Sequence, residues 1–369
     1  MRYDAKLPIW LFAAASSAGV AAFSVVDTLY FREIGFTLQQ IGLFTAVFSL
    51  SSALAEFPSA LVFDMWSNKR AIQLGNLIRI VAFTLFFLAT TQGEVVLAEV
   101  VAGVGAAAMS GTLHALLMNQ VEDSQRFSVL TKLTGLSSAT ALLGGLAGML
   151  VFMWSPRWVW LLAVAFFLLA GIAMAFAADD RHTIERQPIS AFTRSAFSAL
   201  RTRGCWVLAL LSCAVVIPLM LWQLRLGGTV SLGSVLLAFI LMKVAGLAGP
   251  WLSKRLNLSE KHFPSVMVLN CLALTGFGFP VPLPVATACF FIHVLCHILM
   301  TVMVNSIFHS ELDSRTRATA GSIATLVETG MVAVVAPLGG FLANEGHLER
   351  AVLLAVGLYA AALIVDIRR

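Results

Sequence analysis

A few ionisable side chains inside long apolar runs are the residues of this sequence best placed for chemistry. The acids are Asp27, Glu99 and Glu328, and the cation is Lys243. A charge at the centre of a membrane helix costs about 2.5–3.5 kcal/mol on insertion scales, so such groups usually face a polar cavity on the path of ions or substrates. Asp27 and Glu99 are therefore candidates to attract a cationic substrate or to carry a proton. Solvation near the lipid headgroups is the alternative for both.

Opposite charges at similar depths predict ion pairs. Glu56 lies about 12 Å from the end of its apolar run at 1.5 Å per residue, and Arg79 lies at a similar depth in the next run. We predict that these two form a structural ion pair. Lys243 and Glu328 also lie at similar depths, and their bridge would either break during function or only hold helices together.

Histidines are the remaining candidates. His293 and His297 are four residues apart and share one face of a helix, but no third ligand is evident, so no metal site is predicted. A proton relay and plain packing between helices both stay open for them. His114 and Asn305 fall at corresponding positions of an internal match described below, and both are predicted to line a cavity.

Composition sets the environment of these groups. The chain has 369 residues, of which 59% are hydrophobic and only 12% are charged. Soluble domains carry about 25% charged residues, so most of this protein's surface must face lipid. The net charge of +5 does not indicate nucleic-acid binding, because the basic residues sit in short loops between apolar runs, as in membrane proteins.

A helix needs about 20 residues to cross a bilayer, and the sequence contains twelve candidate spans. They cover roughly 8–30, 37–62, 71–91, 95–118, 128–153, 158–178, 204–222, 229–252, 263–280, 284–308, 318–342 and 349–366. The charged stretch 179–203 resembles a basic amphipathic helix on the membrane surface. We therefore predict an all-α integral membrane protein with six-helix bundles at 1–178 and 204–369, joined by a cytoplasmic linker at 179–203.

Lysine and arginine set the predicted orientation. If the N-terminus is cytoplasmic, most basic residues of the loops lie inside and few lie outside, as the positive-inside rule requires. This predicts a multi-pass protein of the cell (inner) membrane with both termini cytoplasmic. The first apolar run is too long for a cleaved signal peptide and is read as a retained span.

An internal match supports two similar halves. QVEDSQR (Gln120–Arg126) resembles ELDSRTR (Glu311–Arg317), and both follow an even-numbered predicted span. Two six-span halves in the same orientation fit a parallel repeat around an axis along the membrane normal.

The stretch EFPSALVFDMWSNKR (Glu56–Arg70) resembles a signature of the major facilitator superfamily between spans 2 and 3. The segment GVGAAAMSGTLHALL (Gly103–Leu117) resembles span 4 of its efflux members, and Arg317 to Thr319 with Ser322 resembles its entry to span 11. The positions that match the first signature are Glu56, Pro58, Asp64, Lys69 and Arg70. Two of its glycines are replaced, by Ala60 and Ser67.

The resemblance implies twelve helices that expose a central site alternately to each side. It also implies a conformational latch, in which Asp64 binds the start of span 11 near Arg317, with Arg126 as a second partner and Lys69 and Arg70 in the same loop. The alternative is that Asp64 only caps a helix.

We predict proton-coupled export, by antiport, of a small amphipathic molecule. No GxxxxGK[ST] nucleotide loop is present, so a proton gradient is the expected energy source, and no cofactor is predicted. Proton-coupled import by symport is the alternative. A membrane-embedded transferase is a further one, for which no convincing catalytic cluster is found. The expected partners are the substrate, protons and the lipid bilayer, and the expected state is a monomer.

Overall fold

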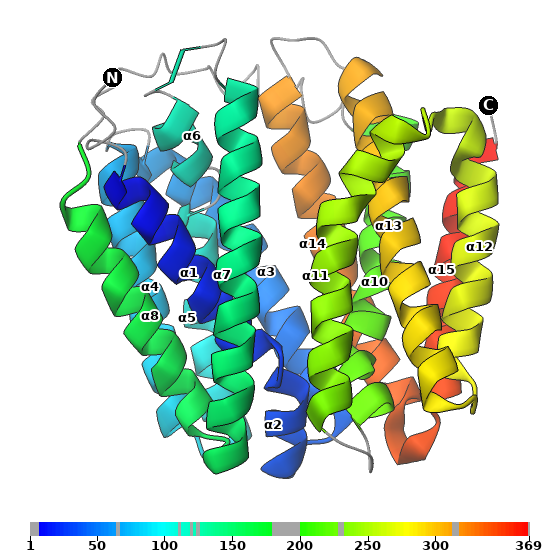
Figure 1. The fold of residues 1–369 in the computed structure, drawn as a ribbon, viewed down its shortest axis with the longest axis horizontal. Helices are drawn as coiled ribbons and strands as arrows, with labels where there is room; N and C mark the ends of the chain where they lie inside the picture. The colour runs from blue at the N-terminus through cyan, green and yellow to red at the C-terminus, as the bar shows by residue number, and fades with distance from the viewer. Residues whose placement is uncertain are drawn as a thin grey trace. The chain divides into compact units, whose positions relative to one another are not determined.

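The structure is a computed structural model that describes residues 7–63, 67–109, 112–118, 121–122, 126–178, 200–227, 232–311 and 317–367. All the regular secondary structure in these residues is helical (Figure 1). The prediction of an all-α protein is therefore confirmed for the described part of the chain. Hydrocarbon favours this outcome, because a helix satisfies its backbone hydrogen bonds within one segment.

The chain divides into two compact units. The first comprises Met1–Tyr30 and Val47–Arg186, and the second comprises Phe31–Ala46 and Gln187–Arg369. The boundary after Arg186 falls inside the predicted linker, whereas the prediction did not place Phe31–Ala46 with the second half. The predicted domain boundaries stay predictions.

The helices follow the apolar runs closely. The first unit contains α1 (Leu7–Ser24), most of α2 (Asp27–Glu33), α4 (Asn68–Leu88), α5 (Gln92–Met109), α6 (Thr112–Met118), α7 (Arg126–Trp154) and α8 (Trp158–Ala175). The second contains α10 (Arg203–Gly227), α11 (Leu232–Arg255), η3 (Glu260–His262), α12 (Phe263–Gly278), α13 (Leu283–Glu311), α14 (Arg317–Leu342), η4 (Asn344–Gly346) and α15 (Leu348–Ile367). Helix α3 (Leu38–Phe63) begins in the second unit and ends in the first.

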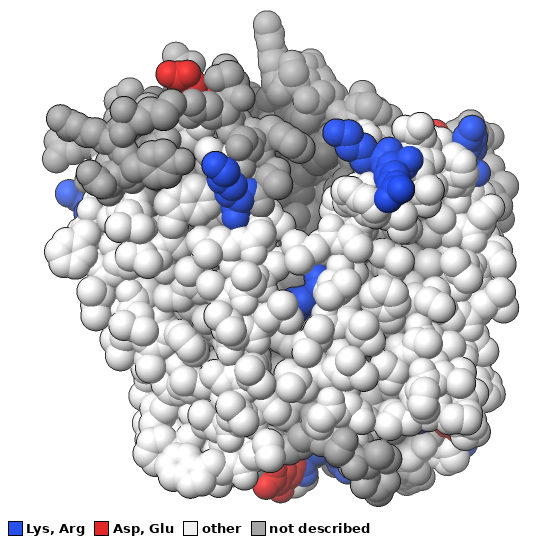
Figure 2. Space-filling view, in the orientation of Figure 1, with Lys and Arg blue, Asp and Glu red and all other residues white. Residues whose placement is uncertain are grey.

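Eleven stretches of the described residues are helices long and apolar enough to cross a membrane. Every predicted range holds a helix, but α12, at the ninth range, has 16 residues, fewer than the about 20 that a full crossing needs. Twelve crossings therefore stay a prediction. In the first range, a turn at Val25 and Val26 separates α1 from α2, a break that the sequence analysis did not predict. On the face drawn in Figure 2, uncharged side chains cover most of the middle, apart from one cation near the centre, and the other charged side chains lie toward the upper and lower edges.

Four helix pairs recur between the two units. In the first, α1 packs against α7 and α8, and α4 packs against α5 and α8. In the second, α10 packs against α14 and α15, and α12 packs against α13 and α15. Numbered by the predicted spans, each of these pairs of the first unit recurs six spans later.

Glycines allow the closest of these approaches. Gly144 and Gly148 of α7 face Ala18 and Ala22 of α1, and a Cβ at either glycine would overlap an alanine carbonyl oxygen. Small residues four apart are the usual means of bringing two membrane helices into backbone contact, because lipid provides no hydrophobic drive for helix association.

Cationic side chains cap helix ends at the predicted outer side of each unit. Arg157 donates from Nη2 to the Leu88 carbonyl oxygen (3.0 Å) at the end of α4. It also donates to the carbonyl oxygens of Phe87 and Ala89. Arg225 donates from Nη2 to the Phe279 carbonyl oxygen (2.8 Å) just after α12. The last carbonyls of a helix have no partner within it and carry partial negative charge, so a nearby cation stabilises them.

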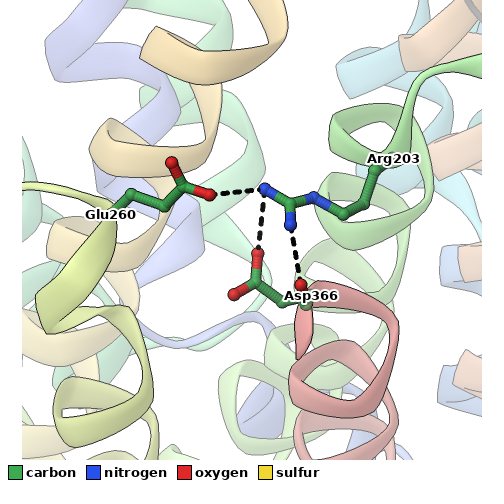
Figure 3. Close-up of polar contacts among 3 residues, drawn as sticks. All are labelled: Arg203, Glu260 and Asp366. Atoms are coloured by element: carbon green, nitrogen blue, oxygen red, sulfur yellow. Dashed lines mark hydrogen bonds and ion pairs between the residues drawn. The ribbon is translucent and has the colours of Figure 1, made fainter. Parts of the chain in front are cut away.

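The predicted cytoplasmic ends of α8 and α15 are held in the same way. Lys69 Nζ donates to the carbonyl oxygens of Ala175 (2.9 Å) and Ala177 (2.6 Å). Arg203 donates from Nη1 to the Asp366 carbonyl oxygen (2.7 Å), and its Nη2 forms an ion pair with Glu260 (2.7 Å; Figure 3). Arg203 thereby ties the start of α10 to η3 and to the end of α15.

Replacing Gly148 by alanine tests the contact between α1 and α7. The added Cβ would overlap the Ala22 carbonyl oxygen, so we expect Gly148→Ala to lower the free energy of unfolding by about 1–3 kcal/mol, the usual cost of overpacking. Gly135→Ala in the same helix is the matched control, because a Cβ there meets nothing within 4 Å. Thermal unfolding in detergent compares the two, and an equal loss of stability in both variants would contradict the proposed contact.

Candidate functional site

Two of the predicted acids interact electrostatically in the first unit. Asp27 begins α2, and its Oδ1 accepts a hydrogen bond from the Thr28 backbone N–H (2.7 Å). Glu99, about two turns into α5, is half-buried and interacts electrostatically with Asp27. Like charges at close range repel in a medium of low dielectric constant, and a proton or cation held between them removes the repulsion. The pair can therefore take up a positive charge.

Arg79 lies near the middle of α4 and contacts three other helices of the same unit. Its Nη1 donates to Ser16 Oγ (3.0 Å) and lies 3.5 Å from Met109 Sδ. Its guanidinium carbon lies 4.4 Å from the centre of the Phe167 ring. Glu56 is not among its contacts in the described part of the chain, so the Glu56–Arg79 ion pair stays a prediction, and other groups hold the arginine in this structure.

Lys243 and Glu328, which the sequence predicts to form a bridge, have separate partners in the second unit. Lys243 Nζ lies 5.0 Å from the centre of the Phe239 ring. Glu328 Oε2 accepts a hydrogen bond from Ser212 Oγ (2.7 Å), across from α14 to α10. No ion pair joins Lys243 to Glu328 where the structure describes both, so their bridge stays a prediction.

The two histidines of α13 belong to a buried polar network. His293 Nδ1 lies 2.8 Å from Asn270 Oδ1, and the amide oxygen only accepts, so this nitrogen carries the hydrogen. His297 Nδ1 lies 3.0 Å from the hydroxyl of Tyr359 on α15. Among the described residues, Asn270 Nδ2 and His293 Nε2 are buried without a hydrogen-bond partner.

Sequence reasoning missed Asn270 and Tyr359. Each is a single polar residue within an apolar run, and that isolation was the available signal. Their roles depend on which helices become neighbours, α12 and α15 with α13, which spacing along the chain does not reveal.

The predicted latch lies mostly outside the described residues. This applies to Asp64 and to the side chains of Arg126 and Arg317, and also to the side chain of the cavity candidate His114. Lys69 binds the end of α8, and Arg70 is exposed at the start of α4. Asn305 is half-buried on α13. The latch therefore stays a prediction.

A family model described as the Major Facilitator Superfamily matches residues 9–337. The chain belongs to this superfamily. The match is to the superfamily as a whole, so membership of its efflux-like branch stays a prediction. No curated protein matches the chain.

Solved transporter structures share the fold of this superfamily member. A mutant of the nucleoside transporter NupG has a TM-score of 0.76 at 14% identity and 99% coverage of both chains. An auto inhibited POT family peptide transporter has a TM-score of 0.74 at 11% identity, covering 98% of this chain and 94% of its own. A bacterial homologue of the human lysosomal transporter Spinster has a TM-score of 0.70 at 15% identity, covering 98% and 95%. At these identities the likeness shows the fold alone.

Leucine substitutions at Asn270 and His293 test the buried hydrogen bond between these two residues. His293→Leu leaves Asn270 Oδ1 buried without its partner, so we expect a loss of about 1–3 kcal/mol in the free energy of unfolding. Asn270→Leu combined with His293→Leu removes both polar groups and should recover much of that loss. Thermal unfolding of the single and double variants measures the difference. A double variant less stable than either single one would argue against the pairing.

Proposed function

We propose that this superfamily member is a secondary transporter that moves a small amphipathic molecule across the membrane by alternating access. The observation that carries the proposal is the recurrence of the same helix pairs in both units, with α10 and α12 taking the places of α1 and α4. Two such bundles fit a parallel repeat, the arrangement of transporters whose halves rock around a central site. The match of Gln120–Arg126 with Glu311–Arg317 supports the same repeat.

The Asp27–Glu99 pair is the proposed site of proton coupling. Each carboxylate lies in a membrane helix, and their mutual repulsion favours the binding of one proton between them. Proton uptake on one side and release on the other would couple the gradient to substrate movement. Further candidates for the cavity are Lys243, Glu328, His293, His297 and the predicted positions His114 and Asn305.

Export by antiport is the favoured direction. The support is the likeness of Gly103–Leu117 to span 4 of efflux members, together with 26 phenylalanines and 13 methionines suited to an amphipathic substrate. Import by symport is the second candidate, because the carboxylate pair by itself sets no direction. The proposal includes cytoplasmic termini, the cell (inner) membrane, a monomer and the latch at Asp64.

Neutralising Asp27 tests the coupling. A screen for compounds that raise the unfolding temperature of the purified protein supplies test substrates, whose flux is then followed in proteoliposomes in both directions. We expect Asp27→Asn to reduce flux driven by a pH gradient to the level of empty vesicles, because the pair can no longer exchange its proton. Substrate exchange without a gradient should persist.

Glu94→Gln is the matched control, since Glu94 is an exposed acid on the same helix as Glu99. Its carboxylate accepts a hydrogen bond from the Thr90 backbone N–H. This variant should keep gradient-driven flux. Unchanged flux in Asp27→Asn would remove Asp27 from the coupling role, and absence of flux for every stabilising compound would count against transport.

A further inference from the structure

Arg79 carries a full positive charge deep within the first unit. It lies about 17 Å from the start of α4 and about 14 Å from its end, at 1.5 Å per residue. At that depth a cation without an anionic partner is unfavourable by about 2.5–3.5 kcal/mol on insertion scales. None of its contacts, Ser16, Met109 and Phe167, carries a negative charge. The charge is therefore uncompensated among the described residues.

One edge of the guanidinium is unused. Arginine has five N–H donors in a planar fork, and only those on Nη1 have partners among the residues that the structure describes. Nε and Nη2 of Arg79 make no hydrogen bond to any residue that the structure describes. The side chain is only half-buried, so part of it remains accessible. These two nitrogens form the edge that binds the two oxygens of a carboxylate or phosphate side by side.

The surrounding helices fix the plane of this fork. A Cβ at Gly105 of α5 would lie 3.1 Å from Arg79 Cγ, so the glycine makes room for the arginine stem. A Cβ at Gly19 of α1 would lie 2.8 Å from Phe167 Cε1, so this glycine lets the Phe167 ring come beneath the guanidinium. The Ser16 hydroxyl then fixes Nη1. A donor held in this way loses little entropy when it binds.

We propose that Arg79, oriented by Ser16 and Phe167, is a binding subsite for an oxyanion, and that the transported molecule carries a carboxylate or phosphate on an apolar body. The Phe167 ring and Met109 provide apolar surface beside the fork. The assignment of this group to the substrate rests on the proposed transport function. The binding itself does not.

Matched aromatic probes test the subsite on the purified full-length protein. Benzoate and phenyl phosphate are compared with neutral benzamide and cationic benzylammonium, at constant ionic strength, by thermal unfolding in detergent. We expect the two anions to raise the unfolding temperature and the other two probes to leave it unchanged. The relative effects of benzoate and phenyl phosphate show which oxyanion the subsite prefers.

Variants assign the effect to Arg79. Arg79→Gln should abolish the anion-induced shift, and Arg79→Lys, which keeps the charge but loses the two-nitrogen edge, should reduce it. Ser16→Ala should reduce it as well and serves if Arg79→Gln fails to fold. Arg157→Gln is the control, because that guanidinium is already bonded to carbonyl oxygens and its loss should leave the shift intact.

Equal shifts with benzoate and benzamide, or an anion shift that persists in Arg79→Gln or is undiminished in both Arg79→Lys and Ser16→Ala, would overturn the proposal. The two proposals fail separately. Anion binding without flux of any compound would refute transport and leave the subsite standing, whereas flux of cationic or neutral compounds without anion binding would refute the subsite alone.

Discussion

Hydrocarbon offers no hydrogen-bond partner. The unpaired carbonyl groups at the C-terminal end of a membrane helix therefore need partners from outside that helix. Four cations donate hydrogen bonds to such carbonyl groups: Arg157 at the end of α4, Lys69 at α8, Arg225 at α12 and Arg203 at α15. The capped ends correspond between the units, because the residue offset that relates QVEDSQR to ELDSRTR also relates Leu88 to Phe279 and Ala175 to Asp366. The cations come from different positions in each unit, so what recurs is the capped helix end and not the residue that caps it.

The same constraint separates the charges at the helix ends from those within the membrane. Cations at the ends bind carbonyl oxygens, which are fixed and cannot leave. Within the membrane, Arg79 and Lys243 each lie against an aromatic ring without an acid among their described contacts, while Asp27 and Glu99 interact electrostatically. An aromatic ring stabilises a cation only in part, by about 0.5–2 kcal/mol, so the ring leaves each of these two charges partly uncompensated.

The helices and the family were predictable from sequence because both depend on local patterns: runs of apolar residues long enough to span, and a charged signature between two of them. The partners of Arg79 were not predictable in the same way. Matching depths along two helices gives the position of a side chain along the membrane normal but not its direction around the helix axis. Ser16 and Phe167 meet both conditions in this structure. The cap of Arg157 on Leu88 leaves no sequence signal at all, since every residue has a carbonyl group.

The break in the first span links packing to chemistry. Gly148 lets α7 approach Ala22 of α1, and α1 ends two residues later at Ser24. The Val26 N–H then donates to the Phe23 carbonyl oxygen (2.9 Å) in a tightened turn. The Thr28 N–H donates to the Asp27 carboxylate (2.7 Å) and not to a backbone carbonyl oxygen. A hydrogen bond to a carboxylate is stronger than one to a neutral group, so a proton arriving at Asp27 weakens the start of α2. In the proposed coupling, protonation of the Asp27–Glu99 pair would therefore act on the first span through the contacts between Asp27 and Thr28.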